Sequence, residues 1–136
     1  MANEVTKVTL LGNAGDPVEY IVAEDVAVPK GTIMRISASP QTAIAATTDG
    51  QFFAGIASVE KVSGDGITKL ALWTHGVFDM VSDTAGCTLG QPVKIDTGAN
   101  LVSTADSDTV ATAGEVVGLS LETLTDGQSG CVLVNL

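Results

Sequence analysis

The chain contains few aromatic, basic, histidine and cysteine residues. Phe, Trp and Tyr make up 4% of its 136 residues, and 6 Lys and Arg oppose 16 Asp and Glu, which gives a net charge of −10. Proteins that dock on nucleic acid replace phosphate counterions with basic side chains, and a strongly negative chain repels phosphate instead. An anionic membrane surface repels it for the same reason. The composition therefore argues against nucleic acid and membranes as partners.

Long apolar runs are absent as well. No stretch approaches the roughly 20 residues that a membrane-spanning helix requires, and the N-terminal residues MANEVTKVTLLGNAGDP lack the basic segment of a secretory signal. Two cysteines, Cys87 and Cys131, are too few for a disulfide framework. We therefore expect a protein that is made and used without export through a membrane.

Catalytic and ligand-binding patterns are missing too. His75 is the one histidine, and no Gly-x-Ser-x-Gly elbow accompanies it. Phosphate-binding loops and zinc-ligand spacings do not occur. Several acidic pairs lack the calcium-loop pattern and are interpreted as solvated loop carboxylates; they are Glu24 with Asp25, Asp79 with Asp83, and Asp106 with Asp108. The sequence predicts no enzyme, no cofactor and no metal site.

β-branched residues and closely spaced turn residues dominate what is present. Val, Ile and Thr fit a pleated, half-buried surface, and Gly, Asn, Asp and Pro interrupt them at short intervals. No segment shows a sustained apolar period of 3.6 residues. The pattern predicts strands at residues 6–11, 18–23, 32–37, 43–47, 52–61, 67–73, 77–81, 92–96, 101–103, 116–124 and 130–135.

The order of turns and strands occurs twice. The first copy runs from KGTIMRI through AIAAT and AGIASVEKV to GDGITKLALW, and the second from LGQPVKI through NLVST and VGLSLETL to TDGQSGCVLVN. In this alignment Gly31 matches Gly90, Gly55 matches Gly118, and Cys131 falls opposite Leu70 as a small core residue. One copy is too small to bury its apolar face alone, so the two are expected to close on a common core.

The expected fold is therefore all-β, a small β-barrel or a two-sheet sandwich built from two pseudo-repeats at about residues 30–73 and 89–135. Residues 18–136 form a single β domain, and residues 1–17 form an N-terminal arm that contains a strand. That strand has apolar residues on both faces. It is either an ordinary first strand or one that another chain completes by strand addition.

The few aromatic residues indicate where a protein partner would bind. Alternation places Trp73 on the strand face opposite Leu70 and Leu72, either in the core of a second layer or at an interface. Adjacent Phe52 and Phe53 point to opposite faces, so one of them is expected to leave the local core. The candidate interface residues are Val5, Val8, Leu10, Leu11, Phe52, Phe53, Trp73 and His75.

Four motifs carry a family resemblance. They are the turn and strand at residues 31–36 and 90–95, the apolar strand that follows it, the Gly-led strands GIA at 55–57 and GLS at 118–120, and the run KLALWTHGVF at 69–78. Over residues 26–136 the chain resembles the small phage capsid decoration (cement) proteins, once grouped as a domain of unknown function and mislabelled recombinase-like. The absence of a Walker loop gives the recombinase label no support here.

The resemblance implies a β-barrel-like domain that trimerises on the outside of an icosahedral bacteriophage head and clamps neighbouring capsid subunits. The implied partners are the major capsid protein and two further copies of the chain. The implied location is the capsid exterior of the virion, after synthesis in the host cytoplasm. In related decoration proteins an N-terminal arm contributes to docking on the capsid.

Other functions remain open at this point. The chain is alternatively a viral head-fibre or tail structural module, or an acidic carbohydrate- or metal-binding β module. An enzyme with an unrecognised site is a further alternative.

Overall fold

The computed structural model describes residues 3–9, 17–105 and 113–135. Among these residues there is no α-helix, and each predicted strand is present, most of them with tighter bounds. Leu10 and Leu11, the end of the first predicted strand, lie outside the described residues. The elements are β1 (Thr6–Thr9), β2 (Val18–Ile21), β3 (Ile33–Ile36), β4 (Ala43–Ala45), β5 (Phe53–Ala57), β6 (Lys69–Trp73), β7 (His75–Ser82), β8 (Pro92–Ile95), β9 (Leu101–Thr104), the 3₁₀ helix η1 (Ala113–Glu115), β10 (Val116–Ser120) and β11 (Ser129–Asn135).

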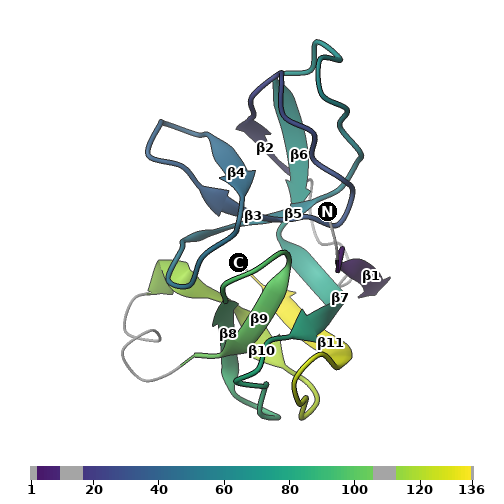
Figure 1. The fold of residues 1–136 in the computed structure, drawn as a ribbon, viewed down its shortest axis with the longest axis vertical. Helices are drawn as coiled ribbons and strands as arrows, with labels where there is room; N and C mark the ends of the chain where they lie inside the picture. Colours follow the sequence, from purple (N-terminus) through teal and green to yellow (C-terminus); the bar gives the residue numbers. More distant parts are fainter. Residues whose placement is uncertain (1–2, 10–16, 106–112, 136) are drawn as a thin grey trace.

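The strands form two sheets that pack together as a sandwich. The five-stranded sheet has the order β2-β6-β5-β3-β4 and occupies the upper part of the molecule in Figure 1. The six-stranded sheet has the order β1-β7-β11-β10-β8-β9 and lies below it. Strand β9 also pairs in parallel with β7, so the larger sheet curls back on itself. The predicted all-β fold class is confirmed in its two-sheet form.

The two sheets repeat one strand order. Strands β2-β6-β5-β3-β4 correspond one by one to β7-β11-β10-β8-β9, so each copy also includes the strand before the segment found in the sequence. Backbone pairing has the same register in both copies: Met34 pairs with Ala45 and Gly55, and the matching Val93 pairs with Thr104 and Gly118. One strand-pairing scheme is therefore built twice.

Irregular features of the pairing are repeated too. The β3–β5 pairing skips Ala54, and the β8–β10 pairing skips Val117 at the matching position. An isolated bridge joins Val28 to Lys61 in the first copy and Cys87 to Leu124 in the second. The parallel bridge between Ile21 and Thr42 corresponds to the β7–β9 pairing.

The structure shifts one position of the sequence alignment. The N–H of Ser58 donates to the carbonyl of Ala71, and the N–H of Leu121 donates to that of Cys131. Cys131 therefore matches Ala71, not Leu70, because the segment before the last strand is three residues shorter in the second copy: Ala71 follows Lys61 by ten residues, and Cys131 follows the matching Leu124 by seven. Cys131 is accordingly half-buried on the outer side of its strand.

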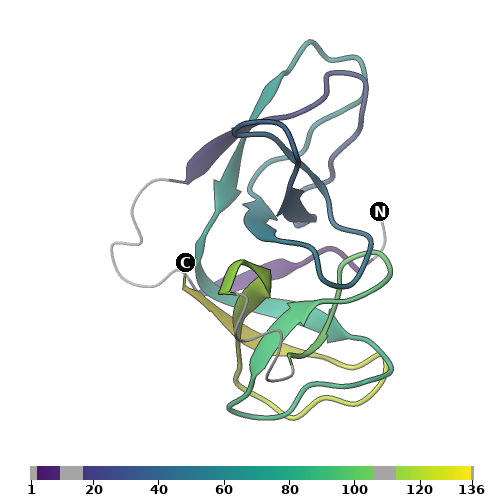
Figure 2. The same ribbon diagram turned by 90° about the vertical axis from the view of Figure 1, so that its left-hand side faces the viewer.

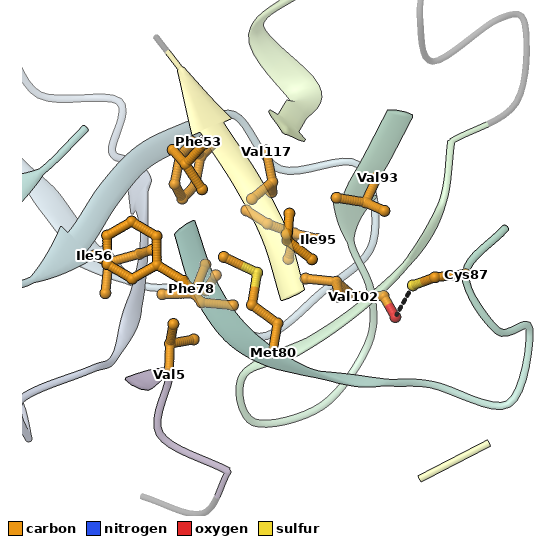
Figure 3. Close-up of a cluster of buried hydrophobic side chains, with 14 of the residues drawn as sticks. Val5, Phe53, Ile56, Phe78, Met80, Cys87, Val93, Ile95, Val102 and Val117 are labelled. Atoms are coloured by element: carbon orange, nitrogen blue, oxygen red, sulfur yellow. Dashed lines mark hydrogen bonds between the residues drawn. The ribbon is translucent and has the colours of Figure 1, made fainter. Parts of the chain in front are cut away.

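Two apolar clusters form the core. One fills the inside of the first copy, with Met34, Leu70 and Leu72 among its members. The other fills the second copy and extends across to one face of the five-stranded sheet, where it includes Ile33, Phe53 and Ile56 (Figure 3). The face of the first copy that carries these three residues is therefore covered by the second copy.

The N-terminal strand β1 lies at the edge of the six-stranded sheet. It pairs antiparallel with β7, and Figure 2 shows it (purple) beside that strand, between the upper and lower sheets. Val5, just before it, is buried in the main cluster, and its N–H donates to the carbonyl of Gly31 (2.7 Å). The described part of the N-terminal segment thus contacts both copies.

Candidate interaction surface

Trp73 ends strand β6 and lies at the rim of the main cluster. Leu70 and Leu72 point into the first copy, so alternation turns Trp73 toward the second. Its ring centroid lies 5.8 Å from that of Phe78, with the planes at 42°. The ammonium of Lys30 lies 5.7 Å from the Trp73 ring centroid, within reach of a cation–π interaction. Trp73 is thus a half-buried residue of the second layer.

A shallow hollow of about 270 Å³ opens beside this tryptophan. It is lined by Glu4, Val5, Thr6, Lys30 and Trp73. The lining combines one carboxylate, one ammonium and one indole, so it is amphipathic. It brings Val5 and Trp73 together, but it includes neither Phe52 nor His75.

The remaining predicted interface residues occupy different environments. Phe53 is buried, whereas Phe52 is 49% exposed and packs near Gly114, as expected for neighbours on opposite strand faces. Val5 and Phe53 are core residues of the single chain and therefore do not belong to its free surface. Val8 lies within β1.

His75 begins strand β7 and is half-buried. Its Nδ1 lies 3.2 Å from the hydroxyl oxygen of Thr74, and no other hydrogen bond joins the ring to a described residue. No group of three or more His, Cys, Asp or Glu side chains is arranged to hold a metal ion within the described ranges.

Lys61 is the one charged side chain that is fully buried among the described residues. Its Nζ donates to the carbonyl oxygens of Glu24 (2.7 Å), Val26 (2.9 Å) and Val62 (3.4 Å). The carboxylate of Asp65 lies 3.5 Å away. Because these partners saturate the three donors of an ammonium, Lys61 joins two loops and has no donor left for a ligand.

Asp65 shapes one of these loops. Its Oδ1 accepts a hydrogen bond from the N–H of Ile67, and its Oδ2 accepts one from that of Val62, both at 3.0 Å. The bond from Ile67 is the main cause that holds the pKa of Asp65 below its ordinary value, and Val62 and the Lys61 ammonium lower it further. Asp65 is thus a carboxylate that stabilises a turn.

Both cysteines are free thiols. Burial raises the pKa of Cys87, whose Sγ lies 3.9 Å from the carbonyl oxygen of Val102. Desolvation also raises the pKa of Cys131, and the nearby Glu122 carboxylate raises it further. Because the thiolate is the nucleophile, neither environment activates a cysteine.

An apolar hollow lies on the second copy, and sequence reasoning missed it. A hollow of about 320 Å³ is lined by Pro92, Val116, Gly118, Leu119 and Leu133, from β8, β10 and β11. We call this surface the Leu119 face. The segments VVGLSL and CVLVN have apolar residues on both alternating sets, which is typical of strands buried on both sides. The alternation therefore does not indicate that one side is open.

Two exposed leucines lie near the end of β10, where the N–H of Gly90 donates to the carbonyl of Ser120. Leu89 is 60% exposed, and Leu121, directly after β10, is 38% exposed. On a chain of net charge −10, exposed aliphatic side chains that lie close together are typical of a surface that contacts another protein.

No protein-family model matches the chain. A search of curated proteins finds no match either. Within the described residues, no helix has the length and apolar character needed to cross a membrane.

Proposed function

We propose that this chain is a virion structural protein that decorates the outer surface of an icosahedral bacteriophage capsid and stabilises it. Its partners are the major capsid protein and, on the capsid, two further copies of itself. It is made in the host cytoplasm and then joins the capsid exterior. The motif resemblance over residues 26–136 suggests this assignment.

The Leu119 face is the observation that supports it best. The described residues present an apolar surface suited to protein contact on an otherwise strongly acidic molecule. Their polar clusters, around Lys61 and Asp65, are occupied in holding loops together. A compact subunit with a protein-binding surface is what a cementing role requires.

Elementary thermodynamics explains how such a subunit stabilises a capsid. A ligand that binds the mature lattice and not the disrupted one shifts the equilibrium toward the lattice by mass action. Many symmetric contacts of modest affinity add up through avidity. The negative charge keeps the free protein soluble and away from DNA before assembly.

The test is to add purified protein to expanded heads of the virus that encodes it, prepared without it. The expected result is saturable binding and a higher temperature of head disruption. Unexpanded heads serve as the control, with weaker binding expected. Absence of binding to expanded heads, from protein shown to be folded, would overturn the proposed function.

A further inference from the structure

The two copies bury matching positions to different extents. Ile56 on β5 is fully buried, whereas the matching Leu119 on β10 is 37% exposed. Phe53 is likewise buried, whereas the matching Val116 is only half-buried. The difference arises because the second copy covers this face of the first, and no described residue covers the same face of the second.

One end of the second copy provides that cover. Phe78 and Ile95 belong to the same cluster as the covered residues Ile33, Phe53 and Ile56. The matching residues of the first copy are Val18 and Ile36, and neither belongs to the apolar cluster inside that copy. Val18 is 42% exposed and Ile36 is 40% exposed, whereas Phe78 and Ile95 are 0% and 2% exposed. The first copy therefore presents, uncovered, the surface that the second copy uses for packing.

Charged groups follow the same pattern. Across the junction between the copies, the ammonium of Lys94 contacts both carboxylate oxygens of Asp49 at 2.8 Å. Arg35 matches Lys94 and lies beside Ile36, but it makes no ion pair with a described residue, and its Nε is buried without a hydrogen-bond partner. We call Val18, Arg35 and Ile36 the end surface.

We propose that the Leu119 face binds the end surface of a second copy of this chain. The contact repeats, between two chains, the packing that joins the two copies within one chain. Both halves of that packing are present and uncovered on each molecule, and they are different surfaces. The contact is therefore heterologous, and it closes into a ring when the rotation between neighbours permits. The proposal rests on the proposed function only for its setting, a capsid-bound oligomer of three copies.

A mixing experiment tests this pairing. Leu119→Asp places a charge in the Leu119 face, and Ile36→Asp places one in the end surface. Each variant alone is expected to lose self-association by at least about 30-fold in Kd, as for an interface hot spot. A mixture of the two is expected to form a heterodimer and nothing larger, because one intact end surface meets one intact Leu119 face.

Sedimentation at up to about 1 mM protein measures these states in the absence of heads. Val62→Asp, at a 62% exposed position outside both surfaces, is the control and should associate like the wild type. Circular dichroism shows whether each variant is folded. A wild type that stays monomeric, or folded single variants whose mixture forms no heterodimer, would overturn the proposal.

Head binding and self-association can fail separately. Monomeric protein that still binds expanded heads would leave the proposed function standing without this interface. Self-associating protein that ignores heads would leave the interface standing without the function.

Discussion

Lys61 shows that matching positions in the two copies can hold chemically different residues. Its counterpart in the second copy is Leu124, which is also buried and forms the same backbone bridge. An aliphatic chain thus fills the position in one copy, while in the other a long side chain also donates to three carbonyl oxygens. The Lys61 ammonium therefore holds together the loop at residues 24–26 and the loop that begins at Val62.

Replacing this residue separates packing from hydrogen bonding. Lys61→Met keeps most of the side-chain volume but removes the donor from three partly buried carbonyl oxygens, so we expect a loss of about 1–3 kcal/mol in the free energy of unfolding, measured by urea denaturation. Lys69→Met is the control. Lys69 is exposed, with a long ion pair to Glu19 at 3.9 Å, and its loss should cost no more than about 0.5 kcal/mol. Equal stabilities of the two variants would contradict this role of Lys61.

At the scale of elements, the N-terminal strand depends on one glycine. Gly31 and Gly90 match and have positive φ angles of 85° and 79°, so alanine is strained at both positions. Only at Gly31 would the added methyl group overlap the backbone of Val5; at Gly90 it would meet open space. Gly31→Ala therefore tests the packing of Val5 and β1 against the first copy, and Gly90→Ala is its control.

We expect Gly31→Ala to destabilise the protein by about 1–3 kcal/mol more than Gly90→Ala, because overpacking adds to the shared strain. Hydrogen exchange should show lost protection in β1 for Gly31→Ala alone. If both variants lose the same stability and keep β1 protected, Val5 does not hold the strand against the first copy.

The positions of the strands were predictable from local chemistry. Runs of β-branched residues between Gly, Asp and Pro turns mark each one, and the bounds changed mainly where the predicted strands 52–61 and 116–124 end early, at Ala57 and Ser120. The leading strands of the two copies escaped the comparison because VEYI and HGVFDMVS share little beyond strand character. Their correspondence appears only in the pairing registers with Leu72 and Val132.

The candidate surface was less predictable. Trp73 was correctly placed opposite Leu70, and one of the two adjacent phenylalanines does leave the core. The Leu119 face was missed because Leu119 and Ile56 occupy the same kind of strand position and differ only in what packs on them. Which copy is covered is a property of the tertiary arrangement, and no local pattern records it.

At the scale of the whole molecule, the same strand unit occurs twice, and one end of the second copy packs against a sheet face of the first. The first copy has a covered face and an open end, and the second has a covered end and an open face. Within one chain, this packing of an end against a face therefore occurs once. The Leu119 face and the end surface stay uncovered and are available to neighbouring chains. Assembly on a symmetric lattice would complete the pattern on every chain.

The most direct test of this account is a cryo-electron microscopy map of expanded heads of the virus that encodes the chain. We predict three copies at each occupied site on the capsid exterior, with the Leu119 face of each chain against Val18 and Ile36 of the next. Density for the chain on the tail, or heads that carry none of it, would contradict the account.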